Sequence, residues 1–191
     1  NLGKAILSIP FKIFGFFFKM ASKGGGGNEL AQAYNDVRKE FGDLASNEGL
    51  AVVNLAKTML KESRNAAYGG RRMSNAFGKG KKGLANALKA SVEVMKEMGN
   101  ALHLLAKPIS EAGAQVFRMT KALGMSGETI RNMALEARQM GRSVKDAFDE
   151  SIASISKLSK NLGTNVRFVA KVYSQLKNNL TLFAYASTQE L

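Results

Sequence analysis

His103 is the single histidine of the chain, and cysteine is absent, so few side chains could act as a nucleophile, a general base or a metal ligand. Nucleophilic catalysis needs a base beside the attacking group, and a zinc site needs several histidine or cysteine ligands. His103 lies between Leu102 and Leu104 and is accompanied by neither a second histidine nor a suitable carboxylate cluster. We therefore expect a packed or half-exposed histidine rather than a ligand or a base.

Two groups of acidic residues are the remaining candidates for chemistry. Glu93 and Glu97 are spaced to share one helix face, and Asp146, Asp149 and Glu150 form a second group. Such carboxylates could hold a cation, but the spacing of an EF-hand loop is missing. Both groups are predicted to be solvated helix faces. The chain is therefore predicted not to be an enzyme and to require no cofactor and no metal.

The glycines Gly78, Gly80 and Gly83 have the G-x-G-x-x-G spacing of a dinucleotide-binding loop. That loop follows a buried strand, and no apolar strand or βαβ pattern surrounds these glycines. We expect residues 69–83 to be a flexible basic joint, with contact to phosphates or to an acidic protein wall as the alternative. The side chains assigned to such a contact are Arg71, Arg72, Lys79, Lys81 and Lys82.

The elements that carry these side chains are predicted to be helices. Two prolines, abundant Ala, Leu, Lys and Met, and almost no alternating β-branched pattern favour an all-α fold of short to medium amphipathic helices. A helix over 84–107 has Gly99 as a weak point, and Pro108 is expected to stop or restart it before another helix over 109–123. The predicted segments are an amphipathic stretch over 1–23, a glycine linker over 24–27, a helical segment over 28–68, the basic joint over 69–83, a helical segment over 84–123 and a glycine-jointed array of short helices over 124–191.

Three glycines divide that last array. Each of Gly124, Gly141 and Gly163 follows an apolar residue and precedes a Ser, Thr or Asn. A glycine can close a helix in the left-handed conformation, and the polar residue after it can accept hydrogen bonds from the next helix. In the second connector, Asp146 follows Ser143 by three residues, an acidic variant of the capping box. Each connector is predicted to end one helix and begin another.

Residues 1–23 are very apolar, with lysines spaced about two helical turns apart. The segment is too charged, and too interrupted by Pro10, for a membrane span, and it lacks a signal-peptide cleavage site. It is expected to pack against partner subunits, and an interfacial membrane helix is the alternative. The residues assigned to this hydrophobic contact are Phe11, Phe14, Phe16, Phe17 and Phe18.

The net charge of +13 indicates anionic partners. Residues 1–90 carry 15 basic and 6 acidic side chains, a balance of +9, and residues 91–191 carry 13 and 9, a balance of +4. Nucleic acid, lipid headgroups and an acidic protein lumen all remain open as the partner. The absence of cysteine agrees with assembly in a reducing cytoplasm.

The stretches Leu135–Phe148, Leu158–Asn165 and Leu182–Leu191 resemble helical segments of tail tape measure proteins from large, contractile-tailed bacteriophages. Arg38–Ala45, downstream of a segment rich in lysine and phenylalanine, also resembles them. The resemblance implies a mostly helical structural protein held as a trimer or hexamer inside the phage tail and assembled in the host cytoplasm. It also implies that the length of the protein sets the length of the tail.

The partners that this resemblance implies are other copies of the chain, the tail tube and baseplate hub proteins, the host membrane during ejection and, transiently, DNA. The helices are short and jointed rather than one long heptad array, as expected of a part near the hub rather than the part that spans the tube. Two other functions remain open. One is a membrane-active pore former or effector that inserts residues 1–23, and the other is a packaging protein that binds nucleic acid without sequence preference.

Overall fold

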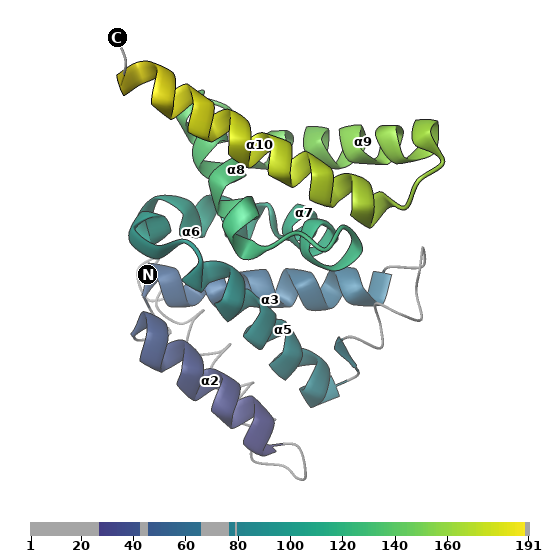
Figure 1. The fold of residues 1–191 in the computed structure, drawn as a ribbon. Coiled ribbons are helices and arrows are strands. Elements are labelled where there is room, and N and C mark those ends of the chain that lie inside the picture. The colour runs from purple at the N-terminus through teal and green to yellow at the C-terminus, as the bar shows by residue number, and fades with distance from the viewer. Residues whose placement is uncertain (1–26, 43–45, 66–76, 79, 190–191) are drawn as a thin grey trace, which may run out of the picture. The chain divides into compact units, whose positions relative to one another are not determined.

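The computed structural model describes residues 27–42, 46–65, 77–78 and 80–189, and every regular element within them is helical (Figure 1). The all-α prediction is therefore confirmed for these residues. The chain forms two compact units, Asn1–Val92 and Glu93–Leu191, which are described separately below. Helix α5 (Gly80–Lys96) passes from one unit into the other.

In the first unit, helix α2 (Gly27–Phe41) packs against helix α3 (Asn47–Asn65). Leu30, Ala33 and Val37 recur at three- and four-residue steps on α2, and all three are buried. Ser46 joins the two helices, because its Oγ donates to the carbonyl of Phe41 at 3.2 Å and accepts from the N–H of Gly49 at 3.0 Å. This hydroxyl caps the start of α3 while it contacts the end of α2.

Helix α5 packs closely on α3 within the same unit. Ser91, which is fully buried, donates to the carbonyl of Ala87 at 2.7 Å and lies 3.6 Å from the sulfur of Met59. A Cβ added at Gly83 would lie 2.6 Å from the carbonyl oxygen of Gly78, so only glycine fits there. Residues 80–83, the end of the predicted basic joint, form the first turn of α5.

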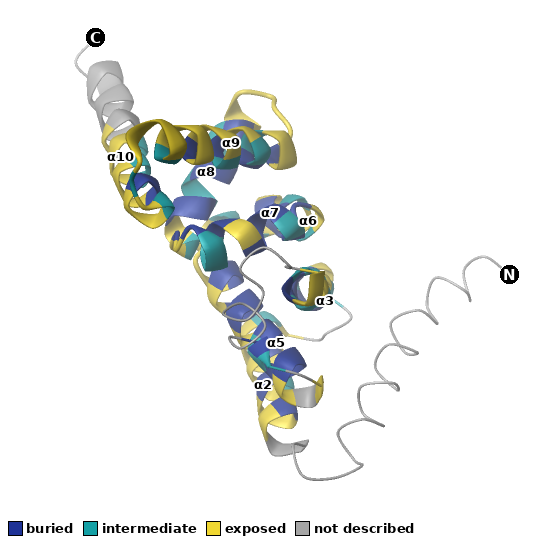
Figure 2. Cartoon of the chain, turned by 90° about the vertical axis from the view of Figure 1, so that its right-hand side faces the viewer, coloured by how far each residue is buried: buried dark blue, intermediate teal, exposed yellow. Residues whose placement is uncertain are grey.

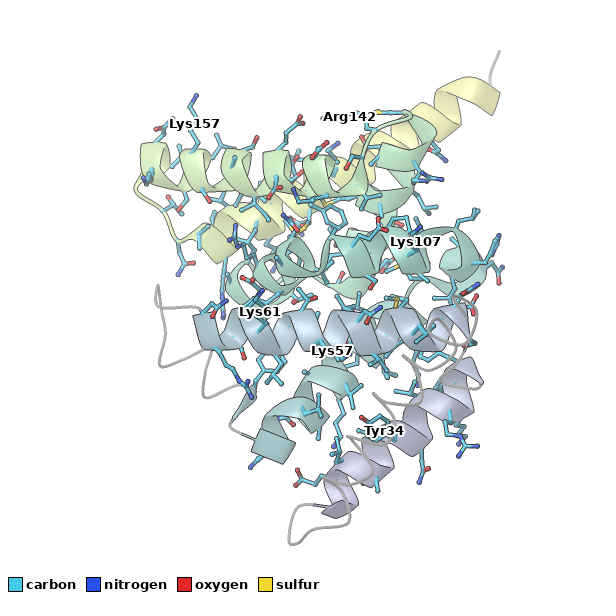
Figure 3. The ribbon with its side chains drawn as sticks, turned by 180° about the vertical axis from the view of Figure 1, so that it is seen from behind. Tyr34, Lys57, Lys61, Lys107, Arg142 and Lys157 are labelled. Atoms are coloured by element: carbon cyan, nitrogen blue, oxygen red, sulfur yellow. The ribbon has the colours of Figure 1, made fainter. Side chains whose placement is uncertain are left out.

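Two ionisable side chains of this unit are affected by burial. Burial raises the pKa of Tyr34 on α2 and lowers the pKa of Lys57 on α3 (Figure 3). Both shifts favour the uncharged form of the group. The two therefore have opposite effects on the pH dependence of stability.

The second unit begins with the end of α5. The helix is interrupted at Gly99, which has φ of +49°. A 3₁₀ turn (Gly99–Ala101) leads into α6 (Leu102–Glu111), and Pro108 lies inside that helix. The prediction that Pro108 stops or restarts the helix is wrong. The break comes earlier because Gly99 takes a conformation that a helix cannot continue through, and Pro108 removes only one N–H donor from a short helix.

The rest of the second unit is a series of short elements followed by longer helices. After α7 (Gly113–Phe117), a π-helical turn (Arg118–Ala122) leads to α8 (Gly127–Gln139), α9 (Val144–Leu162) and α10 (Val166–Gln189). Helices α8, α9 and α10 all contact one another. Phe148 and Ile155 of α9 are fully buried, while much of α9 and α10 remains exposed (Figure 2).

Candidate joint and interface residues

The three predicted joint glycines adopt the left-handed conformation. Their φ angles are +71° at Gly124, +65° at Gly141 and +60° at Gly163. In each case the helix before the glycine ends within a few residues of it, at Ala122, Gln139 and Leu162. These positive φ angles confirm the predicted conformation at all three positions. Glycine is suited to them because a residue without Cβ takes such angles at little cost.

The polar residues after the glycines cap the helices that follow. Ser126 accepts from the N–H of Thr129 at 3.2 Å at the start of α8, and Ser143 accepts from the N–H of Asp146 at 3.4 Å at the start of α9. In the third connector the acceptor is Asn165, whose Oδ1 lies 2.9 Å from the N–H of Arg167. The predicted stop followed by a start is therefore present in all three connectors.

The first joint is also held by a residue far away in the sequence. Arg167 of α10 donates through Nε to the carbonyl of Ala122 at 3.2 Å and through Nη2 to the carbonyl of Lys121 at 3.0 Å. These carbonyls lie at the end of the π-helical turn, where a helix leaves acceptors unpaired. The guanidinium of Arg167 satisfies them and so ties α10 to the connector at Gly124. Sequence reasoning missed this role, because nothing local marks Arg167 as a capping residue.

Two further contacts fix the helices of this unit. Lys177 of α10 forms an ion pair with Glu136 of α8, with Nζ and Oε1 2.7 Å apart. The Tyr173 hydroxyl lies 3.3 Å from Oγ of Ser151 on α9. Helix α10 is therefore attached by polar contacts to both of its neighbouring helices.

The acidic group on α9 is occupied by structural contacts. Both carboxylate oxygens of Asp149 accept from Nε2 of Gln115 at 3.0 Å, and Gln115 is itself buried. Glu150 forms an ion pair with Arg142 and raises the pKa of that guanidinium (Figure 3). Asp149 therefore links α7 to α9 while its side chain remains 44% exposed, so the predicted solvated face is only partly correct for this residue. Sequence reasoning could not identify Gln115 as its partner, because 34 residues separate the two.

The remaining candidate side chains lie at the surface of the described residues. His103, Glu93 and Glu97 are all exposed. The backbone carbonyl of Glu97, rather than its carboxylate, accepts from Nη1 of Arg131 at 3.2 Å. Within the described part of the chain, no group of three or more His, Cys, Asp or Glu residues is placed to hold a metal ion.

Most of the predicted contact residues lie outside the described residues. These are Phe11, Phe14, Phe16, Phe17, Phe18, Arg71, Arg72 and Lys79. Lys81 lies on α5 but its side chain is outside the described set, and Lys82 is exposed on the same helix. None of the helices whose structure is described is both long and apolar enough to cross a membrane.

An apolar surface that the sequence analysis did not single out lies at the end of α9 and along α10. We call this surface the α9–α10 stripe, and its residues are Leu158, Leu162, Phe168, Val172 and Leu176. All five side chains are exposed, although each is large and hydrophobic. Leu158 is 43% exposed although it follows the buried Ile155 by three residues on α9.

Comparison with known proteins finds no matching protein-family model, no matching curated protein and no matching solved structure.

Proposed function

We propose that this chain is a structural virion protein, part of a tail tape measure protein that works as a homo-oligomer with the tail tube and the baseplate hub. The observation that carries the proposal is the array of capped helices joined at Gly124, Gly141 and Gly163. Two of the stretches that resemble tape measure proteins, Leu135–Phe148 and Leu158–Asn165, contain the second and third of these joints.

The physical properties of the second unit agree with an assembly role. Its polar contacts between helices, such as Gln115 with Asp149 and Lys177 with Glu136, hold the helices together. Large apolar side chains on α9 and α10 remain uncovered in the single chain. An exposed apolar surface of this kind favours association with another protein surface.

The excess positive charge supports a position inside a negatively charged tube. A chain with a balance of +13 is attracted to an acidic wall, and this attraction orients the chain without requiring close contacts. Short helices that end at glycine joints can also separate one at a time, since each joint already interrupts the backbone hydrogen bonding. Such a protein can leave the tube ahead of the DNA during ejection.

The test begins with the mass and shape of the purified chain, measured by light scattering and small-angle X-ray scattering. The proposal predicts an elongated oligomer of a few copies. It further predicts that the chain, added to purified tail tube subunits, makes them polymerise, as seen by electron microscopy. A compact monomer that leaves tube subunits unpolymerised would contradict the proposal and move attention to vesicle binding and to salt-dependent DNA binding.

A further inference from the structure

The α9–α10 stripe exposes a large part of each of its apolar side chains. The exposed fractions are 66% at Leu162, 61% at Phe168 and 57% at Leu176. Leu158 at 43% and Val172 at 38% complete the surface. Removing apolar side chains of this size from water is favourable, so a partner that covered the stripe would be bound more tightly.

Helix α10 has two apolar faces, and only one of them is used within the unit. Val169 and Ala170 are buried on the face that packs against α8 and α9. Phe168, Val172 and Leu176 follow one another at steps of four, so they share a separate face of the helix. From Phe168 to Leu176 this ridge extends about 12 Å along the helix axis.

The charged residues of the chain segment that carries the stripe are all basic. Between Ser151 and Gln189 the sequence contains five basic residues and no acidic one. Lys157, Lys160 and Lys171 are exposed, and Lys157 extends from α9 in Figure 3. Arg167 donates to backbone carbonyls, which satisfy its N–H groups without neutralising its charge. Only Lys177 is paired with a carboxylate.

We propose that the α9–α10 stripe is a docking surface for an amphipathic helix of a partner protein, with an apolar ridge flanked by Asp and Glu. A ridge of side chains at steps of four is the surface by which one helix packs into the grooves of another. The cations on either side attract acidic flanks and repel basic ones, which gives the surface its selectivity. The same exposed side chains support the proposed assembly role, and this inference deepens that role by naming the kind of partner, while the peptide experiment below tests the docking surface without any tail protein.

Charge excludes the two most immediate alternatives within this chain. Two copies of the stripe facing each other would bring together two sets of Lys157, Lys160 and Lys171, and the segment between Ser151 and Gln189 has no carboxylate to pair with them. Residues 1–23 of the same chain are apolar but carry only basic charges. Like charges at an interface oppose association, so neither is the favoured occupant. A lipid surface can also take up an apolar ridge flanked by lysines, and the vesicle experiment below distinguishes it from a partner helix.

The experiment uses the full chain and two synthetic helical peptides labelled with fluorescein. Both peptides carry the same leucine ridge, flanked by Glu in one and by Lys in the other, and binding is measured by fluorescence anisotropy. The Glu peptide is expected to bind at least tenfold more tightly than the Lys peptide, and its affinity should fall as salt is raised. Equal binding of the two peptides, or no binding of the Glu peptide, would overturn the proposal.

Matched variants locate the binding surface. The double variant Phe168→Ser/Leu176→Ser should weaken Glu-peptide binding at least tenfold. Leu104→Ser should leave binding unchanged, because Leu104 is 53% exposed on α6, outside the stripe. Lys157→Glu/Lys171→Glu keeps the apolar ridge and should weaken binding of the Glu peptide while strengthening binding of the Lys peptide. An equal loss in the Leu104 variant would show that the peptide does not recognise the stripe.

Vesicle binding distinguishes a lipid surface from a partner helix as the occupant of the stripe. Sedimentation with phosphatidylcholine vesicles that contain phosphatidylglycerol reports binding to an anionic lipid surface. Vesicle binding that is lost in the Phe168→Ser/Leu176→Ser variant, together with no binding of the Glu peptide, would assign the stripe to lipid and refute a helix partner. Circular dichroism and the urea midpoint of each variant establish that the fold is retained.

Discussion

Replacing Gly163 by alanine is expected to destabilise the second unit by about 1 kcal/mol through the backbone alone. Gly163 closes α9 at φ +60° and ψ +24°, and a Cβ added there would have no neighbouring atom within 4 Å. The loss therefore includes no steric clash with another residue. The left-handed conformation destabilises an alanine by about 1–2 kcal/mol. Alanine also restricts the unfolded chain more than glycine does, which stabilises the folded protein by about 0.4–1 kcal/mol.

Asparagine provides the matched control at the same position. Asn tolerates the left-handed region better than alanine does, so Gly163→Asn should lose clearly less stability than Gly163→Ala. A valine adds a branched Cβ and should lose more than alanine. Gly141 has φ of +65° and equally open surroundings, so its three variants should follow the same order.

Urea denaturation followed by circular dichroism measures the change in the free energy of unfolding. Hydrogen exchange of the α9 and α10 amides, followed by mass spectrometry, assigns the change to the second unit. If the alanine, asparagine and valine variants of Gly163 and Gly141 all have wild-type stability, the left-handed joints do not constrain the fold. The joint argument would then be wrong.

Three other substitutions test contacts within the units. In Gly127→Ala the new Cβ would lie 2.8 Å from Cγ and 3.1 Å from Cβ of Glu97, so the free energy of unfolding should fall by about 1–3 kcal/mol. In a double-mutant cycle measured by urea denaturation, Glu97→Ala should recover part of this loss. Additive effects of the two substitutions would contradict the contact. Glu136→Gln breaks the ion pair with Lys177, and the side chains of Glu136 and Lys177 are 31% and 33% exposed. The free energy of unfolding in urea should fall by at most about 1 kcal/mol, and the loss should decrease as salt is raised. A larger loss at high salt would show that packing, not charge, is responsible. Burial raises the pKa of Tyr34 above that of an unfolded tyrosine. The free energy of unfolding is therefore unaffected by this group below about pH 10 and falls as the pH rises further, because the unfolded chain then loses the phenol proton first. The wild-type chain should therefore lose more stability than Tyr34→Phe between about pH 9 and about pH 11, and parallel losses in urea would refute this linkage.

The features that the sequence predicted correctly depend on neighbouring residues. A left-handed glycine and a capping Ser or Asn interact within a few positions, so Gly141 and Ser143 could be interpreted from their immediate neighbours. The position of the helix interruption was mispredicted because Gly99 and Pro108 are both signals that can end a helix. Pro108 is the stronger helix breaker in general, but Gly99 ended the helix first and left Pro108 within the next one.

The contacts that the sequence did not predict join residues far apart in the chain. Gln115 bonds to Asp149 across 34 positions, and Arg167 bonds to the carbonyl of Lys121 across 46. A polar side chain on a helix can face solvent or a partner, and only the packing of the whole unit decides between them. The exposure of Phe168 belongs to the same class, because α10 has two apolar faces and the sequence does not indicate which one the unit buries.

The attachment of α10 explains how it can hold the stripe in place. Arg167 fixes the start of the helix to the π-helical turn, and Lys177 fixes it to α8 about 2.8 turns later. The span between these contacts includes Phe168, Val172 and Leu176. A helix held at both ends of its apolar ridge loses little conformational entropy when a partner covers that ridge, which favours binding. Arg167→Met/Lys177→Met removes both contacts together with two positive charges. Loss of charge alone should weaken Glu-peptide binding and strengthen Lys-peptide binding, whereas loss of positioning should weaken the binding of both peptides. Unchanged affinity in that variant would show that the two contacts stabilise the fold without positioning the docking surface.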